Sequence, residues 1–132
     1  GGSYSNGEET VEKIRRAVPD ISRVYIEDIH NRDALSEAIA GSDLLVNATS
    51  LGMCPLEKET PVPAEYLHPG LAVADVVYNP RETRLLREAK EAGCRAVVDG
   101  TGMLLWQGAE AFRLFTGQEM PAEEVRERFF TE

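Results

Sequence analysis

Two short and almost wholly apolar runs constrain the fold of this chain more than any other feature. Residues 44–46 read LLV and residues 73–77 read VADVV, so apolar side chains occupy consecutive positions, with Asp75 as the interruption. A strand with one face in solvent alternates apolar and polar residues, whereas a parallel strand covered on both faces is apolar almost throughout. The runs therefore predict a parallel sheet that helices cover on both sides.

The segments around these runs repeat one order, in which an apolar strand is followed by a polar turn and an amphipathic helix. This order is typical of α/β proteins. We expect strands at residues 23–27, 43–47, 71–77 and 95–98, and helices at residues 8–18, 82–92, 102–115 and 122–130. A further helix, capped by Asn31 or Asp33, runs to about residue 40 and ends at a left-handed Gly41. Prolines between residues 48 and 67 predict a long ordered loop.

Length and charge limit the classes of protein to which the chain can belong. With 132 residues, 42% of them hydrophobic, the chain is long enough for one modest core, which predicts a single domain. Its 23 acidic residues outnumber 14 basic ones and give a net charge of −9. The basic residues do not gather into the dense cluster that a polyanion requires, which argues against nucleic acid as a partner.

The location of the protein is predicted from features that the sequence lacks. No apolar run approaches the roughly 20 residues needed to cross a bilayer, and residues 1–7 have neither the charged nor the apolar region of a signal peptide. We therefore expect a cytoplasmic protein with no membrane partner. Cys54 and Cys94 lie outside any metal-ligand pattern, which predicts two free thiols and no metal site.

The first candidate site follows the strand expected at residues 43–47. Residues 47–53 read NATSLGM, so small and hydroxyl-bearing side chains stand at the carboxyl end of that strand, where ligands bind in open parallel sheets. Thr49 and Ser50 can hydrogen-bond a ribose or an amide. The alternative is an ordinary polar strand end without a ligand.

The second candidate site follows the strand expected at residues 71–77. Residues 75–80 read DVVYNP and place the phenol of Tyr78 and the amide of Asn79 at the same edge of the sheet. A tyrosine at this position can reach a polyol or a carboxylate with its hydroxyl. The alternative is a tyrosine that covers the core and holds its hydroxyl in water.

A glycine-rich turn follows the last expected strand. Residues 99–108 read DGTGMLLWQG and nearly match the G-x-G-x-x-G of dinucleotide-binding loops, but Leu105 replaces the third glycine, so we reject a phosphate loop here. The glycines would instead allow a flat ring to approach. Met103 offers either a polarizable contact or a core position, Gln107 an amide for a hydroxyl or a carboxylate, and Trp106 is expected in the core.

The three motifs together, in this order and at this spacing, resemble those of the shikimate dehydrogenases. MCPLE at residues 53–57 and LLWQ at residues 104–107 resemble the quinate/shikimate branch most. The resemblance covers roughly residue 43 to the end. It implies a partial Rossmann-like, doubly wound parallel sheet of about four strands flanked by helices, with the first two strands of the parent fold missing. It also implies reversible oxidation, with NAD or NADP, of shikimate or quinate to the 3-dehydro ketone in aromatic amino-acid biosynthesis.

The resemblance implies roles for residues only where they match the family's motifs. Tyr78 and Gln107 match the family's substrate-contacting tyrosine and glutamine. The implied cofactor-binding residues are Thr49, Ser50, Val76, Val77, Asn79, Gly100 and Met103. The catalytic Lys and Asp of the family belong to an amino-terminal substrate domain, and we expect residues 1–132 to be only the carboxy-terminal part of the NAD(P)-binding domain. No catalytic residue is therefore predicted in this chain, and we expect the chain alone to be inactive.

Two alternatives stay open at the level of sequence. If the first two parent strands are missing, residues 23–27 are separated from the other strands. They would then repack beside residues 43–47 or pair with another copy through dimerisation or strand exchange. A third possibility is that the missing strands exist as a separate piece. The chain could also be a non-catalytic nucleotide-binding or regulatory module derived from this fold. Such a module would have no need of Tyr78 and Gln107 at strand and helix ends.

Overall fold

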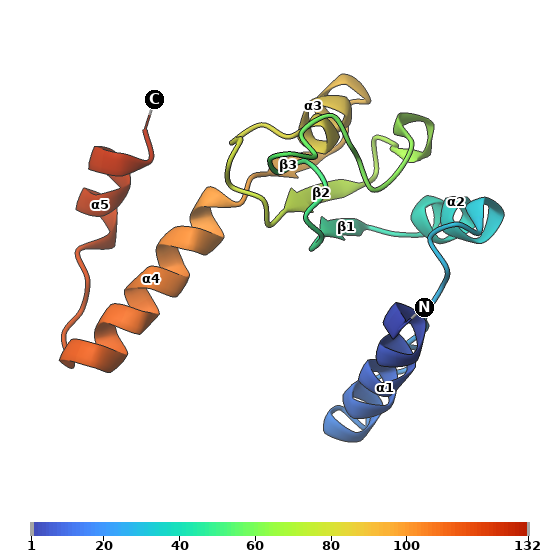
Figure 1. Cartoon of the computed structure of the whole chain (residues 1–132), viewed down its shortest axis with the longest axis horizontal. Coiled ribbons are helices and arrows are strands. Elements are labelled where there is room, and N and C mark those ends of the chain that lie inside the picture. The colour runs from blue at the N-terminus through green and yellow to red at the C-terminus, as the bar shows by residue number, and fades with distance from the viewer. Residues whose placement is uncertain (1, 132) are drawn as a thin grey trace. The chain divides into compact units, whose positions relative to one another are not determined.

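The computed structural model describes residues 2–131, and the chain divides into two compact units, Gly1–Gly41 and Ser42–Glu132. The first unit contains helices α1 (Gly2–Ala17) and α2 (Arg32–Ala40). The elements of the second unit, in chain order, are β1 (Leu44–Asn47), the short 3-10 helix η1 (Ala64–Tyr66), β2 (Ala72–Asp75), α3 (Arg84–Glu91), β3 (Ala96–Val98), α4 (Thr101–Thr116) and α5 (Ala122–Phe129) (Figure 1).

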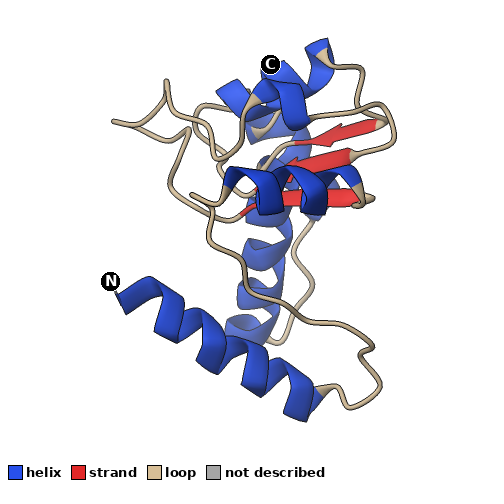
Figure 2. Ribbon diagram, turned by 90° about the vertical axis from the view of Figure 1, so that its right-hand side faces the viewer, coloured by secondary structure: helices blue, strands red, loops and turns tan. Residues whose placement is uncertain are grey.

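The three strands form one parallel sheet in the order β1-β2-β3, and Figure 2 shows them side by side. The register pairs Asn47 of β1 with Asp75 of β2, and Ala74 of β2 with Val98 of β3. The carboxyl ends of all three strands therefore lie at one edge of the sheet. The predicted α/β class and the predicted parallel sheet are confirmed.

One face of the sheet is packed against α3 and carries most of the core of the second unit. Leu85, Leu86 and Ala89 of α3 are at most 2% exposed, and Val73 of β2 beneath them is fully buried. The helix begins at its N-cap Thr83 and ends before Gly93, whose φ of 71° is left-handed and therefore favours glycine. The helix predicted at residues 82–92 is thus confirmed, at Arg84–Glu91.

Within the second unit, the opposite face of the sheet has no helix packed on it, whereas the sequence predicted helices on both faces. Leu44, Val46 and Val98 alternate with less exposed positions of their strands and are 57%, 50% and 56% exposed. Among the helices of the second unit, α3 packs on β2 and β3 while α4 packs on α5, so neither α4 nor α5 covers this face.

The segment at residues 23–27, predicted as a strand, is not one in the described chain. It keeps the period of two, because Val24 and Ile26 are half-buried while Tyr25 is 71% exposed. A strand also requires a paired neighbour, and this segment lies in the unit that contains α1 and α2. Whether it pairs with a second copy stays a prediction.

The remaining helices agree with the predicted ones apart from details at their ends. Asn31 caps α2 by accepting a hydrogen bond from the amide of Ala34, but Gly41 has a φ of −91° and is not the left-handed glycine that we expected. α4 ends at Gly117, which is left-handed with a φ of 69°.

Trp106 of α4 was expected in the core, but its side chain is 54% exposed. The guanidinium of Arg126 lies 6.0 Å from the centre of its ring.

Candidate functional site

All three strands end in the same local structure at the shared edge of the sheet. The side chains of Asn47, Asp75 and Asp99 each accept a hydrogen bond from the backbone N–H two residues later, at 3.1, 2.9 and 2.9 Å. This bond mimics a backbone turn and bends the chain away from the strand direction. The segments that carry the predicted site residues therefore leave the sheet side by side.

A buried polar network joins two of these segments to α3. The carboxylate of Asp75, 3% exposed, accepts from the Asn47 amide at 3.0 Å and from the Thr83 hydroxyl at 2.7 Å. The same Asn47 amide donates to the carbonyl of Leu51 at 3.1 Å. Buried polar groups are costly unless they are hydrogen-bonded, and here each has partners from different segments. The network fixes the loop after β1 relative to the end of β2.

The third segment lies close to the residues that follow β2, because Gly100 has no side chain. A Cβ atom built on this buried glycine would lie 2.6 Å from the carbonyl oxygens of both Val76 and Val77. We expected the glycines of this turn to admit a flat ring. At Gly100 the close neighbour is instead the backbone of residues 76–77, while a Cβ on Gly102 would meet nothing within 4 Å.

The predicted cofactor-binding residues after β1 are exposed. The hydroxyl of Thr49 donates to the Asn47 side-chain oxygen at 2.7 Å and accepts from the amide of Leu51 at 3.1 Å. The Thr49 hydroxyl thus makes its hydrogen bonds within the turn. It has less hydrogen-bonding capacity for a ligand than the sequence predicted. Ser50, the neighbouring candidate, is exposed, and its carbonyl accepts from the amide of Met53.

The four predicted residues after β2 differ in what they offer to a ligand. Val77 is only 5% exposed, so its side chain belongs to the core, whereas Val76 is half-buried. Tyr78 is 48% exposed and Asn79 is exposed, and the structure describes no side-chain hydrogen bond for either. The phenol and the amide at this edge are therefore available to a ligand.

Helix α4 begins at the edge of the sheet and carries the last two predicted residues. Met103, in the first turn, is 51% exposed. Gln107 is exposed, and its amide donates to the carbonyl of Leu104 in the same helix at 3.0 Å. The contact with Leu104 uses one donor of the Gln107 amide and leaves its oxygen and second hydrogen for other partners.

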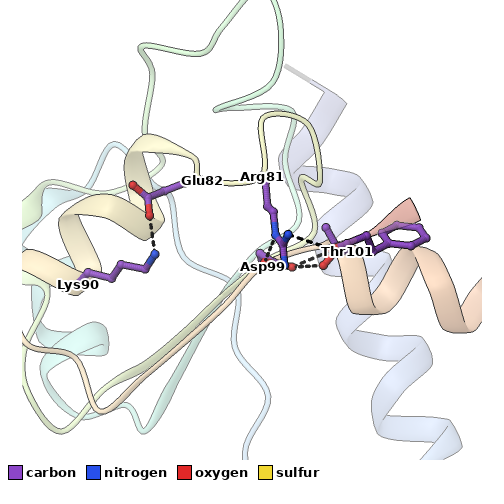
Figure 3. A network of polar contacts seen from close by, with 6 residues as sticks. Arg81, Glu82, Lys90, Asp99 and Thr101 are labelled. Atoms are coloured by element: carbon purple, nitrogen blue, oxygen red, sulfur yellow. Dashed lines mark hydrogen bonds and ion pairs between the residues drawn. The ribbon is translucent and has the colours of Figure 1, made fainter. Parts of the chain in front are cut away.

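A cluster of charged side chains lies beside these segments and was not predicted (Figure 3). Arg81 donates from Nε to the Asp99 carboxylate at 3.1 Å and from Nη1 to the carbonyl of Phe130 at 2.9 Å. The other carboxylate oxygen of Asp99 accepts from the amide and the hydroxyl of Thr101. Partial burial acts to raise the pKa of Asp99, but the Thr101 hydrogen bonds and the Arg81 guanidinium outweigh it and hold that pKa below its usual value.

A pocket of about 770 Å³ opens beside this cluster, between β3, α4 and α5. Its walls include Val98, Leu105 and Arg126. None of the nine residues that we predicted to bind substrate or cofactor lines it. The pocket therefore does not mark the predicted site, which lies where the three strands end.

The buried polar network and the charged cluster were the parts of the site that sequence reasoning missed. A signal existed for Asp75, because a carboxylate inside an otherwise apolar strand must find partners when it is buried. No comparable signal existed for Arg81, whose partners are 18 and 49 residues away in the sequence.

Within residues 2–131, no three His, Cys, Asp or Glu side chains come together as a metal site. No helix in the described part of the chain has the length and apolarity to cross a membrane. Cys54 and Cys94 are free thiols.

Comparison with known proteins gives one family domain and many similar relatives. A domain described as "Shikimate 5'-dehydrogenase C-terminal domain" matches residues 100–128. A shikimate dehydrogenase (NADP(+)) of Streptococcus uberis is 40% identical over 131 residues, which are 98% of this chain and 44% of that protein. A quinate/shikimate dehydrogenase of Escherichia coli O139:H28 is 50% identical over 105 residues, which are 79% of this chain and 36% of that protein.

A solved structure is similar to nearly the whole chain. The shikimate 5-dehydrogenase of Listeria monocytogenes, in complex with shikimate and NAD, superposes with a TM-score of 0.84 at 44% identity. The match covers 96% of this chain and 43% of that one. The chain thus spans less than half the length of the relatives that it matches.

Proposed function

The chain belongs to the shikimate dehydrogenase family, and from this premise we propose that it forms the carboxy-terminal part of the cofactor-binding domain of an enzyme that oxidises shikimate or quinate reversibly with NAD or NADP. The enzyme would use these residues to bind and orient its two ligands. The chain by itself would be inactive, because no residue in it is assigned to proton transfer.

The arrangement of the three strand ends is the observation that carries this proposal. The turns after Asn47, Asp75 and Asp99 leave the same edge of one parallel sheet. They hold seven of the nine proposed ligand-binding residues, and Met103 and Gln107 follow in the first two turns of α4. Ligands of open α/β sheets bind beyond the carboxyl ends of the strands.

The residues at this edge fit the nicotinamide end of the cofactor. Half-buried Val76 and exposed Met103 offer apolar surface, and the missing side chain of Gly100 lets the segment that leads to Met103 approach Val76 closely. Ser50 and Asn79, both exposed, offer polar groups to the ribose or the amide. The bound cofactor supplies the acceptor for the hydride that leaves the ring carbon of the substrate.

Tyr78 and Gln107 are proposed to hold the hydroxylated acid. Both are exposed, and both can donate to a carboxylate or exchange hydrogen bonds with a ring hydroxyl. Their task is orientation, because hydride transfer requires the carbinol carbon to be held close to the acceptor ring. Proton transfer from the hydroxyl is assigned to no residue of this chain.

A chimeric enzyme tests the proposal. In it, this chain replaces the matching 131 residues of the Streptococcus uberis shikimate dehydrogenase. The chimera is assayed with shikimate and quinate, each with NAD and NADP, and this chain is assayed alone in parallel. We expect turnover from the chimera and none from the chain alone.

The outcomes separate the proposal from its alternative. A folded chimera without activity toward either acid, together with the absence of nicotinamide-dependent shifts in the NMR spectrum of this chain, would favour a non-catalytic interaction module. Turnover by the chain alone would contradict our assignment of proton transfer to residues outside it. Comparison of the kcat/KM values for the four combinations of acid and nicotinamide cofactor identifies the preferred substrate and cofactor.

A further inference from the structure

Arg81 connects three segments that are distant in the sequence. It follows Pro80 at the end of the loop after β2, and its Nε donates to Asp99 at the end of β3 at 3.1 Å. Its Nη1 donates to the carbonyl of Phe130, the C-cap residue of α5, at 2.9 Å. Figure 3 shows the Arg81 guanidinium between the loop and the start of α4.

The partner of Arg81 is itself bonded to α4. Asp99 accepts from the amide of Thr101 at 2.9 Å and from its hydroxyl, so the carboxylate lies on the first turn of the helix that carries Met103 and Gln107. A displacement of Asp99 would therefore also move the start of α4.

The loop between β2 and Arg81 is held at both of its ends. The amide of Val77 donates to the buried carboxylate of Asp75 at one end, and Arg81 is bonded to Asp99 at the other. Between these anchors lie only Tyr78, Asn79 and Pro80, whose side chains have no hydrogen bond in the described structure. The position of the Tyr78 phenol relative to α4 depends on both anchors.

We propose that Arg81 is a positioning residue that fixes the Tyr78 loop to the start of α4 and to the end of α5. Its expected effect on ligand binding rests on the proposed function, whereas its effect on the loop does not. The guanidinium suits this task because its N–H groups point in fixed directions and can serve a carboxylate and a carbonyl at once. A lysine keeps the charge but cannot reproduce this fork.

The chain contains a matched control in Arg84. This arginine donates to a carboxylate, that of Glu88, at 2.7 Å and to a carbonyl, that of Lys58, at 2.8 Å. Its side chain is 42% exposed, close to the 45% of Arg81. Arg84 resembles Arg81 in contacts and exposure but does not join the Tyr78 loop to α4.

The experiment compares Arg81→Ala, Arg81→Lys and Arg84→Ala in the chimera. We expect both Arg81 variants to raise the KM for the acid roughly tenfold to a hundredfold, with kcat changed by less than about threefold, since the loop is misplaced rather than removed. Arg84→Ala is expected to keep both constants near those of the parent. Full activity of Arg81→Lys would overturn the proposal, because it would show that charge alone suffices.

A second pair of measurements tests the route through Asp99. If Arg81 acts through this carboxylate, Arg81→Ala combined with Asp99→Asn raises KM no further than the worse single change. Additive effects would contradict that route.

A measurement on this chain without substrate separates the proposal from the proposed function. The ¹⁵N relaxation of the Tyr78 and Asn79 amides reports loop motion, and we expect lower order parameters in Arg81→Ala but not in Arg84→Ala. Unchanged order parameters would overturn the positioning role even if the chimera were active. Lower order parameters with an inactive chimera would leave the role intact and remove only the enzymatic assignment.

Discussion

At Gly100, backbone atoms of another segment leave no room for a side chain. Because both atoms within 2.6 Å of an added Cβ are backbone oxygens, no side-chain rotation relieves the contact. The segment after β3 would have to move away from β2. The close approach of these two segments is also what sets Val76 beside the start of α4.

Gly100→Ala is therefore expected to destabilise the fold by about 3 kcal/mol, the upper range for overpacking a tight site. The control is Gly108→Ala in α4, where an added Cβ meets nothing within 4 Å. This change is expected to stabilise the fold by up to about 1 kcal/mol, because alanine favours a helix more than glycine does. Urea denaturation of the three proteins measures both effects. Equal stabilities of the two variants would show that the contact at residue 100 relaxes freely.

Tyr78→Phe is the corresponding change at the proposed ligand site. It removes one exposed hydroxyl and keeps the ring, so stability is expected to change little, while the KM of the chimera for the acid rises about tenfold through the loss of one hydrogen bond. Tyr25→Phe, at a 71% exposed position in the other unit, is the control. An unchanged KM would remove Tyr78 from the substrate-binding residues.

The lowered pKa of Asp99 predicts how the stability of the fold depends on pH. Its pKa is lowered in the folded state by Thr101 and Arg81, so the charged carboxylate contributes stability that is present above the unfolded pKa of about 3.9 and is lost as pH falls through the folded pKa. The difference in unfolding free energy between the parent and Asp99→Asn should therefore shrink below about pH 4. Urea denaturation from pH 7 to pH 3 measures this difference, and a constant value over that range would contradict the pKa shift.

At the scale of elements, the strands share one way of ending. An Asn or Asp side chain accepts from the N–H two residues later after β1, β2 and β3. The same bond recurs after residues 23–27, where Asp28 accepts from the amide of His30 at 2.9 Å. This segment therefore keeps the alternation and the terminal turn of a strand and lacks only the pairing.

Thr83 connects the end of β2 to the start of α3 through one hydroxyl. It donates to Asp75 at 2.7 Å and accepts from the amide of Leu86 at 3.4 Å as the N-cap of the helix. Thr83→Val removes both bonds without changing volume, and we expect a loss of about 3 kcal/mol, since a cap is removed and a buried carboxylate loses a partner. Thr83→Ser keeps the hydroxyl and should cost about 1 kcal/mol or less. Thermal denaturation of both variants measures these losses. If Thr83→Val and Thr83→Ser lose similar stability, the cost comes from packing and not from the hydroxyl.

At the scale of the whole molecule, the chain is divided between two units, and the second contains the sheet and every proposed site residue. Its core consists of one sheet face, α3 and the buried residues Val62 and Leu67 of the long loop. The other sheet face is exposed. The second unit should therefore fold without the first, with modest stability.

A chain of residues 42–132 tests this division. We expect it to unfold in one cooperative transition with a midpoint close to that of the corresponding transition in the whole chain. Circular dichroism during urea denaturation of both chains provides the comparison. Absence of a cooperative transition in the shorter chain would mean that residues before Ser42 stabilise the sheet.

The sequence by itself determined the α/β class, three of the four predicted strands, all five helices and the residues at the strand ends. These depend on local properties, namely apolar runs, helical spacing and the preferences of Asn, Thr, Gly and Pro. Tertiary structure decided what depends on contacts between distant segments. It left residues 23–27 unpaired and one sheet face exposed, it committed the Thr49 hydroxyl to Asn47, and it required Gly100 for the approach of two backbones. It also joined Arg81 to Asp99 and Phe130, because only the folded sheet brings their segments to one edge.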